Sequence, residues 1–277
     1  MPLAPIIAAR GARIPAIGFG TSGLGDVRAE HIAAALKVGY RHIDTARKYG
    51  TERAVGEAMR VSDVPREEIF VCTKVSHENL HAGDFARSVD QSLTALGLSY
   101  VDLLLVHWPD KRTPLAETMG ALAKAKRLGL TRHIGVANFN MAMLDEAIRL
   151  CQEPIVTLQV ECHPYLDQSK VIAACRERGL VLTAYCPLAR GRLSGDPVLA
   201  EIAQRHGKTF AQVALRWLIQ HQIVAAIPRS SNPARIAQNI DVFDFELTPE
   251  EMYRIGALKW PDGRIADPTG RAPPWDA

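Results

Sequence analysis

Short apolar runs alternate with amphipathic stretches along almost the whole chain, and this alternation limits the possible fold more than any other feature. Eight runs have the length and composition of buried strands: 16–20, 40–44, 69–74, 101–106, 132–137, 155–160, 181–185 and 223–227. Helical patterns lie between them, for example at 28–38, 84–96, 115–128, 141–150 and 169–178. Strands that are apolar throughout suit a parallel sheet covered on both faces. Eight strand–helix repeats therefore predict an α/β fold, a (β/α)8 TIM barrel.

Helix-start signals agree with this division. Asn232 followed by Pro233 predicts an N-cap and a first helical position, and Asp84 is placed to cap the helix that ends near 96. The chain has 277 residues, 47% of them hydrophobic, which is enough for a large core and is a usual length for one barrel. We therefore expect a single domain over residues 1–277.

The two termini differ in character. Residues 2–9 are apolar, but they are too short to span a membrane and lack the positive flank of a signal peptide. They lead into a Gly-Ala-Arg-Ile-Pro turn, so we expect the first strand of an N-terminal β-hairpin that closes the bottom of the barrel. Repeated proline and glycine make residues 260–277 an irregular C-terminal tail.

Charge and cysteine content exclude several function classes. Lysine and arginine number 33 against 30 acidic residues, a net charge of +3, and no basic run is present. We therefore expect neither nucleic acid nor a membrane as a partner. The five cysteines are widely spaced and form no Cys-x-x-Cys pair, which fits reduced thiols in the cytoplasm better than disulfides.

A glycine motif at 18–23 reads G-x-G-x-x-G and is followed by a helix, a strand and Asp44, as in a dinucleotide-binding Rossmann unit. Pro15 interrupts the approaching strand, however, and the helical pattern starts several residues after Gly23. Asp44 also opens a different motif. These departures disfavour the Rossmann interpretation.

A second motif, at 77–81, reads H-E-x-x-H. Such a motif binds zinc when both histidines project from one face of a helix. Here it follows a strand directly, and Ala82-Gly83-Asp84 marks the start of the next helix, so we expect a loop at the pocket rim. No convincing third ligand follows, and we expect no metal site.

Three polar residues each come at the C-terminal end of an apolar run, where a parallel barrel places its chemistry: Asp44, Lys74 and His107. Tyr49 lies five residues after Asp44. A carbonyl can accept hydride from a reduced nicotinamide only if its oxygen receives a proton or an equivalent stabiliser, and Tyr49 is the candidate donor.

The other three residues are expected to serve Tyr49 or the substrate. A Lys74 ammonium about 4 Å away would stabilise the phenolate by roughly 4 kcal/mol at an effective dielectric constant of about 20, lowering the pKa of Tyr49. Asp44 would hold Lys74 and keep it charged. His107 would donate to the carbonyl oxygen and orient the substrate.

Each residue also has a purely structural explanation. Asp44 could cap a loop, Tyr49 could be a half-buried surface aromatic, Lys74 could form a plain salt bridge, and His107 could be a core histidine. The joint pattern of the four residues favours the catalytic interpretation.

Together with later segments, these motifs resemble the aldo-keto reductase family from Ile14 nearly to Glu251. The later matches are 135–139 (GVANF), 159–165 (QVECHPY), 184–188 (AYCPL), and 227–230 (IPRS) through Arg235 and Asn239. The chain looks most similar to bacterial reductases of diketogluconate, methylglyoxal and related carbonyls. The resemblance implies an NADPH-dependent oxidoreductase that acts on a small-molecule carbonyl, for which we expect a monomer. It also assigns the same roles to Asp44, Tyr49, Lys74 and His107.

The resemblance further assigns the cofactor contacts, position by position. Asn138 and Gln159 would bind the carboxamide, Tyr185 would stack on the nicotinamide, and Pro187 and Leu188 would begin the pyrophosphate loop. The 2′-phosphate would lie on Arg229, Ser230 and Arg235, with Asn239 near the adenine. Two guanidiniums and a hydroxyl near a helix start suit a phosphate, although a solvated basic corner is the alternative. Three positions depart from the family pattern: Ala137 replaces serine, Leu158 replaces asparagine and Gln238 replaces glutamate.

Two serines replace residues that are often aromatic in the family, Ser22 and Ser76, and predict an open, polar substrate pocket. Trp108 remains as an apolar wall, and Trp275 is placed to fold over the mouth from the tail. These residues favour small dicarbonyls or oxidised sugars over bulky aromatic ketones. Neighbouring residues such as His77 could refill the space and leave the selectivity broad.

Two rival functions remain at this stage. Lys74 could form a Schiff base, as in class I aldolases, but the adjacent Asp44 would keep it protonated and non-nucleophilic. A non-catalytic NADPH-binding sensor or partner protein on the same barrel would need an exposed partner surface, and no long apolar surface stripe is evident.

Overall fold

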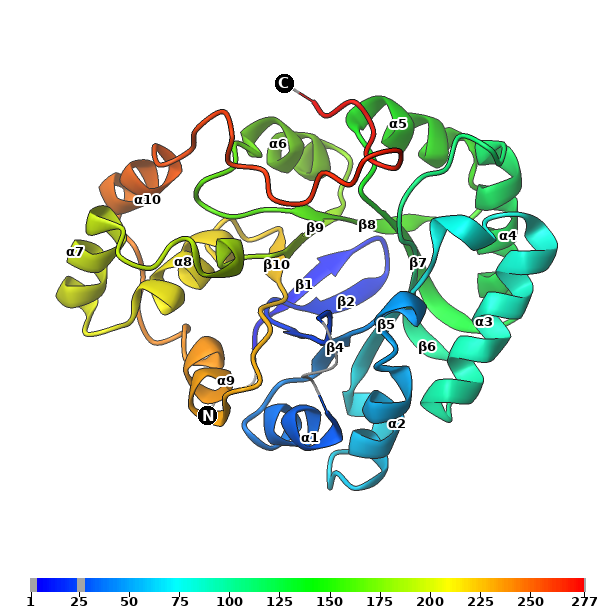
Figure 1. Ribbon diagram of the computed structural model, residues 1–277, viewed down its shortest axis with the longest axis horizontal. Helices are drawn as coiled ribbons and strands as arrows, with labels where there is room; N and C mark the ends of the chain where they lie inside the picture. The colour runs from blue at the N-terminus through cyan, green and yellow to red at the C-terminus, as the bar shows by residue number, and fades with distance from the viewer. Residues whose placement is uncertain (1–3, 24–27, 277) are drawn as a thin grey trace.

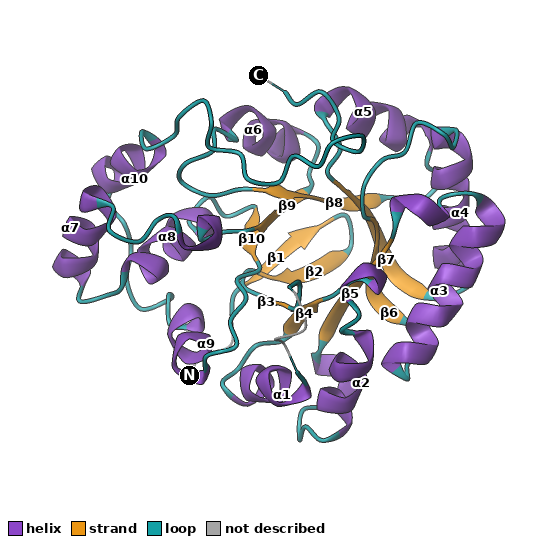
Figure 2. Ribbon diagram, in the orientation of Figure 1, coloured by secondary structure: helices purple, strands orange, loops and turns teal. Residues whose placement is uncertain are grey.

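The computed structural model describes residues 4–23 and 28–276. Eight parallel strands form one curled sheet, in the spatial order β10-β9-β8-β7-β6-β5-β4-β3 (Figures 1 and 2). They are β3 Phe19–Gly20, β4 His42–Asp44, β5 Phe70–Val75, β6 Val101–Val106, β7 Thr131–Ala137, β8 Ile155–Glu161, β9 Val181–Tyr185 and β10 Val224–Ala226. This confirms the predicted α/β fold with eight parallel strands.

Backbone hydrogen bonds also join the two edges of the sheet. Ala226 N donates to Ala16 O at 2.9 Å, and Gly18 N donates to Ala226 O at 2.8 Å. A parallel bridge pairs Ile17 with Ala226. The run at 16–20 therefore follows a strand path, but only Phe19 and Gly20 form a regular strand.

Helices surround the sheet and cover its outer face (Figure 2). They are α1 Ala29–Lys37, α2 Glu52–Arg60, α3 Ala82–Leu96, α4 Leu115–Arg127, α5 Met141–Leu150, α6 Ser169–Glu177, α7 Pro197–His206, α8 Phe210–Ile219, α9 Pro233–Ile240 and α10 Pro249–Gly256. Short 3-10 helices lie in the described loops: η1 Arg47–Tyr49, η2 Arg66–Glu68, η3 His77–Asn79 and η4 Ala189–Gly191. The larger core cluster lies between helices and sheet.

The predicted helix starts were right at α9 and wrong at α3. The Asn232 side chain accepts from the backbone N–H groups of Ala234 and Arg235, and Pro233 is the first helical residue. Helix α3 starts at Ala82 instead, with His81 as its N-cap. Asp84 therefore lies inside the first turn, where its carboxylate still interacts favourably with the helix dipole.

The N-terminal hairpin is present as β1 Ile6–Ala9 and β2 Ala12–Pro15, which pair antiparallel. Residues 2 and 3 of the predicted strand lie outside the described residues. Arg10 and Gly11 turn the chain with positive φ values of 47° and 88°. The hairpin lies across the centre of the ring of strands (Figure 1). Three of its residues pack with inward-facing strand residues in a second core cluster: Ala9, Ala12, Ile14, Phe70, Cys72, Leu103, Leu105, Ala137, Val156, Val181 and Ala225.

The glycines of the 18–23 motif serve packing. A Cβ on Gly18 would lie 2.7 Å from the His42 ring, and one on Gly20 would lie 2.9 Å from the backbone oxygen of Ile227. Helix α1 starts only at Ala29. The two glycines thus let the first strand approach its neighbours inside one curled sheet, which is not the doubly wound arrangement of a Rossmann fold.

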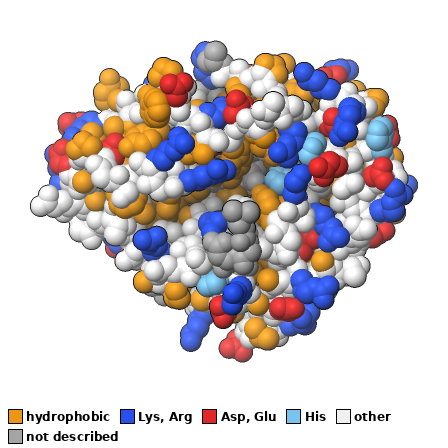
Figure 3. Space-filling view, in the orientation of Figure 1, with side chains coloured by type: hydrophobic (Ala, Val, Ile, Leu, Met, Phe, Trp, Pro, Cys, Tyr) orange, Lys and Arg blue, Asp and Glu red, His pale blue; other side chains and the backbone are white. Residues whose placement is uncertain are grey.

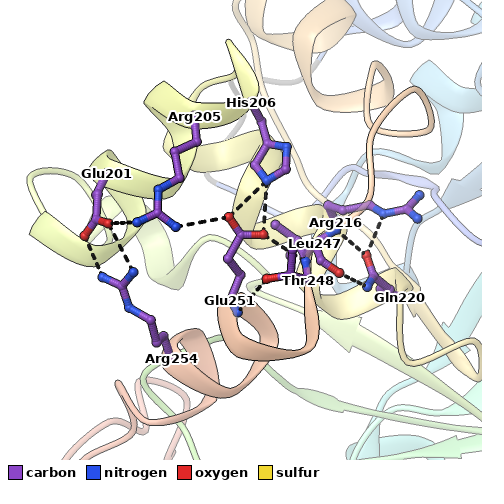
Figure 4. A network of polar contacts seen from close by, with 9 residues as sticks. All are labelled: Glu201, Arg205, His206, Arg216, Gln220, Leu247, Thr248, Glu251 and Arg254. Atoms are coloured by element: carbon purple, nitrogen blue, oxygen red, sulfur yellow. Dashed lines mark hydrogen bonds and ion pairs between the residues drawn. The ribbon is translucent and has the colours of Figure 1, made fainter.

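Polar contacts fasten α10 to α7 (Figure 4). Thr248 and Glu251 form a reciprocal capping box at the start of α10. The Glu251 carboxylate also accepts from His206 Nε2 at 3.1 Å, and Arg254 bonds to Glu201 at 2.6 Å. Beyond α10, residues 259–276 contain no helix or strand and pass over the end of the ring where the strands finish (Figure 1).

Candidate active site

The four predicted catalytic residues meet at the C-terminal ends of neighbouring strands. Asp44 ends β4, η1 carries Tyr49, Lys74 lies near the end of β5, and His107 follows β6. Lys74 Nζ donates to Asp44 Oδ1 at 2.6 Å and to the backbone oxygen of Thr45 at 2.8 Å. Both members of this ion pair are buried, Lys74 completely. A charge pair this deep is costly to bury and is held by these additional hydrogen bonds.

Tyr49 lies between the lysine and the histidine. Its hydroxyl is 3.3 Å from His107 Nε2, and the two rings meet edge to face with centroids 5.4 Å apart. Lys74 Nζ is 5.1 Å from the centroid of the Tyr49 ring. The phenol hydroxyl, the imidazole and the ammonium therefore converge on one point at the mouth of the sheet.

Burial sets the ionisation of Tyr49. Desolvation raises its pKa to about 12, although the Lys74 ammonium acts in the opposite direction. The expectation that Lys74 brings the pKa of Tyr49 below its ordinary value was therefore wrong. Burial destabilises the phenolate by more than its attraction to one ammonium stabilises it.

The other two titratable groups are shifted as well. Burial lowers the pKa of His107 well below its ordinary value, and Lys74 lowers it further, so the imidazole is neutral at physiological pH. Burial alone would lower the pKa of Lys74, but the Asp44 carboxylate and its other neighbours raise it above the ordinary value. The site therefore presents a protonated phenol, a neutral imidazole and a charged ammonium.

Two amides expected to bind the nicotinamide carboxamide make protein contacts here. Gln159 Nε2 donates to Asp44 Oδ2 at 2.8 Å. Asn138, which has a positive φ of 62°, donates through Nδ2 to His107 O at 2.9 Å and accepts from the Tyr185 hydroxyl at 2.7 Å. These contacts fix both amides beside the catalytic residues, and their cofactor role stays a prediction.

The residues predicted to hold the 2′-phosphate gather after β10 and at the start of α9. Arg229 and Arg235 are exposed, Ser230 is half-buried, and Asn239 is buried on α9. Arg229 Nη1 donates to Ser22 O at 3.0 Å, while Ser230 Oγ accepts from Asn232 N at 3.0 Å. Pro187 and Leu188 precede η4, where Ala189 and Arg190 have positive φ values. An accessible guanidinium pair beside a helix N-terminus fits a phosphate group.

The residues predicted to line the substrate pocket lie in different places. Trp108 and Trp275 pack edge to face with centroids 6.1 Å apart, which brings the tail against the loop after β6. Ser76 is buried, and its hydroxyl is 3.2 Å from Glu78 Oε2. Ser22, by contrast, is exposed. The structure thus joins the two tryptophans and leaves Ser22 beside Arg229 on the cofactor side.

Glu161, which the sequence analysis overlooked, anchors the tail. Its buried carboxylate accepts from the backbone N–H groups of Ile265 and Ala266, both at 2.7 Å. Arg264 directly precedes Ile265, and its guanidinium carbon lies 3.8 Å from the centroid of the Trp275 ring. Glu161 ends the apolar strand β8, so the strand-end pattern that indicated Asp44 could have identified it.

The H-E-x-x-H motif spans η3 and the residues before α3, so a 3-10 turn replaces the expected loop. Within residues 4–23 and 28–276, no three His, Cys, Asp or Glu side chains are grouped so that they could hold a metal ion. His81 instead lies 3.4 Å from Glu117.

Similarity to known proteins defines the class to which this chain belongs. Residues 16–259 match the sequence profile of the Aldo/keto reductase family. The chain belongs to this family and is an oxidoreductase.

Individual relatives cover nearly the whole chain. An aldo-keto reductase of Mycolicibacterium vanbaalenii is 45% identical over 247 residues, 88% of each chain. The aldo-keto reductase family 1 member A1 of Mus musculus is 40% identical and covers 93% of this chain and 90% of its own. The crystal structure of a proposed 2,5-diketo-D-gluconic acid reductase B superposes with a TM-score of 0.95 at 47% identity, covering 99% of this chain and 98% of that one. The Bombyx mori aldo-keto reductase in complex with NADP gives a TM-score of 0.87 at 33% identity and 94% coverage of both.

Proposed function

We propose that this protein reduces aldehydes and ketones to alcohols with NADPH, using Tyr49 as the general acid. The observation that carries the proposal is the buried Asp44–Lys74 ion pair behind a Tyr49 hydroxyl that lies 3.3 Å from His107. A protonated phenol, a neutral imidazole and a fixed ammonium at one point suit a reaction in which negative charge develops on a carbonyl oxygen.

Each of the four catalytic residues has a separate role in stabilising that oxygen. Bound NADPH would supply the hydride that adds to the carbonyl carbon. Tyr49 donates its proton to the carbonyl oxygen, so the C–O π bond becomes an alcohol O–H and the phenol becomes a phenolate. Lys74 stabilises that phenolate, and Asp44 holds Lys74 charged and in place. His107 contacts the same oxygen from the other side and orients the carbonyl.

The raised pKa of Tyr49 suits this direction of reaction. A group with a pKa of about 12 keeps its proton at neutral pH, and the alkoxide that forms during hydride transfer is a stronger base. The acid is therefore always present and still transfers its proton. The reverse oxidation would start from the phenolate.

The residues expected at the 2′-phosphate and those expected at the nicotinamide both support the cofactor assignment. Arg229, Ser230 and Arg235 supply two exposed guanidiniums and a hydroxyl beside the α9 N-terminus, a donor set for a phosphate. Asn138 and Gln159 supply amides next to the catalytic residues, and Tyr185 supplies a ring there. The solved Bombyx mori relative is in complex with NADP, which supports the same choice.

Small dicarbonyls or oxidised sugars are the substrates we favour. The structural neighbour described as a proposed 2,5-diketo-D-gluconic acid reductase B supports the sugar class. The Trp108–Trp275 pair places two large rings next to the loop that carries His107, which also favours small substrates. We further propose that the sheet is a closed (β/α)8 barrel in one domain, which the hydrogen bonds between its two edges support. We also propose that the protein works as a monomer in the cytoplasm. Its five free thiols would stay reduced there.

NADPH oxidation measured against a panel of aldehydes, ketones and dicarbonyls tests this proposal. We expect turnover that depends on the carbonyl and yields the alcohol. NADPH binding without turnover of any carbonyl would favour the non-catalytic sensor instead. Borohydride trapping of a lysine adduct would favour a Schiff-base enzyme.

A further inference from the structure

A buried carboxylate, that of Glu52, lies behind the catalytic residues and takes no part in the steps described above. Glu52 is the first residue of α2 and is only 2% exposed. Figure 3 shows basic side chains around the central hollow of the face where the strands finish. Those charges lie at the surface, whereas Glu52 lies beneath it. Removing a charge from water is costly, so the burial of this carboxylate requires an explanation.

The partners of Glu52 do not account for its burial through stability alone. Its Oε1 accepts from Thr73 Oγ1 at 2.7 Å. Its Oε2 accepts no hydrogen bond from any residue that the structure describes, and it lies 3.6 Å from Nη1 of Arg47, whose side chain is 40% exposed. The dipole of α2 favours an acid at this position, but an exposed acid would gain the same effect. A buried acceptor without a donor is unusual and points to a function.

The two partners belong to the elements that carry the acid and the ammonium. Arg47 opens η1, which ends at Tyr49, and Thr73 directly precedes Lys74 in β5. Glu52 therefore connects the turn of Tyr49 to the strand end of Lys74. Lys74 Nζ lies 5.1 Å from the centroid of the Tyr49 ring. Because the attraction between an ammonium and a phenolate depends on their separation, this connection affects how well Lys74 stabilises the phenolate.

The residue before Glu52 makes a second connection to Lys74. Thr51 Oγ1 lies 2.9 Å from Thr21 Oγ1 and 3.0 Å from Thr45 Oγ1, and all three hydroxyls are buried. The backbone oxygen of Thr45 accepts from Lys74 Nζ at 2.8 Å. The start of α2 thus contacts both the residue that precedes Lys74 and a residue that accepts its hydrogen bond.

We propose that Glu52 is a positioning residue for carbonyl reduction, which holds Tyr49 and Lys74 at the separation at which the ammonium stabilises the phenolate. This inference rests on the proposed reductase function and adds a residue outside the four catalytic ones. Glu52 touches neither the carbonyl nor the cofactor and acts only through the geometry of Tyr49 and Lys74. Its loss should therefore slow proton transfer and leave cofactor binding unchanged.

Single-turnover reduction of methylglyoxal by NADPH tests the inference, with the Kd for NADPH as the second measurement. Glu52→Gln keeps the size of the side chain and an acceptor for Thr73, but it removes the charge that faces Arg47. Thr73→Val removes the hydroxyl that donates to Glu52, and Thr73→Ser retains one. These variants separate the two connections of the carboxylate.

Two matched controls come from the same chain. Glu57→Gln makes the same change at an exposed position of α2. Thr131→Val removes a buried hydroxyl at the start of β7, at the end of the sheet away from the catalytic residues, where Thr131 Oγ1 donates to His133 O. The second control measures how far the loss of a buried hydrogen bond affects the rate by itself.

We expect Glu52→Gln and Thr73→Val to lower the rate about ten- to hundredfold, because a small displacement of reacting groups has effects of this size. The Kd for NADPH should stay within about twofold of that of the wild type, since neither residue contacts the expected cofactor ligands. Thr73→Ser should restore most of the rate, and both controls should react like the wild type.

Introducing Glu52→Gln into a Lys74→Met variant separates positioning from a general loosening of the fold. If Glu52 acts through Lys74, the second substitution should lower the remaining rate by less than about twofold. A general loosening would instead lower the rate by the same factor in both backgrounds.

A rate of Glu52→Gln within about twofold of the wild type would overturn the inference, as would equal fold losses with and without Lys74. If Glu52→Gln does not fold, Thr73→Val and Thr73→Ser give the same comparison, and equal rates of these two variants would overturn it. In each case the wild type still reduces methylglyoxal, so the proposed function would stand. Failure of the wild type to reduce any carbonyl of the panel would instead defeat the proposed function.

Discussion

Gln159 donates a 2.8 Å hydrogen bond to the Asp44 oxygen that Lys74 does not use. The carboxylate is thus held on both sides, by an ammonium and by an amide, inside a fully covered part of the sheet. This arrangement fixes the direction from which Lys74 approaches Tyr49. It also means that the expected carboxamide ligand is part of the catalytic support.

Removal of one partner of the ion pair should destabilise the fold. Asp44→Ala leaves the Lys74 ammonium buried and unpaired, so we expect a loss of about 3–5 kcal/mol in the free energy of unfolding. The double variant Asp44→Ala/Lys74→Met should recover part of this loss. Urea denaturation of the two single variants and the double variant measures the coupling, and strictly additive losses would show that the pair does not act as a unit.

The pH dependence of reduction follows from the raised pKa of Tyr49. The phenol is the active form, and a folded-state pKa of about 12 keeps it protonated through the neutral and mildly alkaline range. We therefore expect no loss of kcat from Tyr49 ionisation between about pH 6 and about pH 9, whereas oxidation of the alcohol should rise with pH. A descending limb for reduction with a midpoint near neutrality that persists when the other titratable groups of the site are replaced would contradict this assignment.

Arg235 should control the choice between cofactors. Its guanidinium is exposed near the α9 N-terminus and gains nothing from a bare ribose hydroxyl. Arg235→Ala should weaken NADPH binding about ten- to hundredfold, with little effect on NADH binding or on kcat. Fluorescence titration of both cofactors provides the Kd values. Equal affinity of the wild type for NADPH and NADH at modest salt would show that these arginines form only a solvated basic corner and do not bind the phosphate.

Substrate size gives an independent prediction. The Trp108–Trp275 contact places two large rings next to the loop that carries His107, so methylglyoxal or a keto-sugar acid should give a higher kcat/KM than a bulky aromatic ketone. Trp275→Ala should reduce this difference, because it removes the ring from the tail. Steady-state kinetics on the three compounds measures this preference. A higher kcat/KM of the wild type for the aromatic ketone would refute the proposed preference for small substrates.

Local patterns in the sequence predicted most of the framework. The apolar runs located the strands because a parallel strand is covered on both faces, and the polar residues that follow them, Asp44, Lys74 and His107, had to meet at one edge. The Asn232-Pro233 start was equally local. Asp84 failed as a cap because Ala82 and Gly83 could already be helical, and no single-residue preference decides between neighbouring starts.

Properties that depend on tertiary contacts could not be predicted in the same way. The pKa of Tyr49 depends on how completely the phenol is covered, and burial outweighed the charge of Lys74. The bonds from Gln159 to Asp44 and from the Ile265 and Ala266 amides to Glu161 join segments far apart in the chain. The Trp108–Trp275 contact likewise joins the loop after β6 to the tail.

The central claim is that Tyr49 delivers the proton, and single-turnover reduction by Tyr49→Phe tests it most directly. The variant keeps the ring but removes the hydroxyl that lies 3.3 Å from His107. We predict that the rate falls by about a hundredfold or more while the Kd for NADPH stays close to that of the wild type. Turnover by Tyr49→Phe at a rate near that of the wild type would contradict the proposed mechanism.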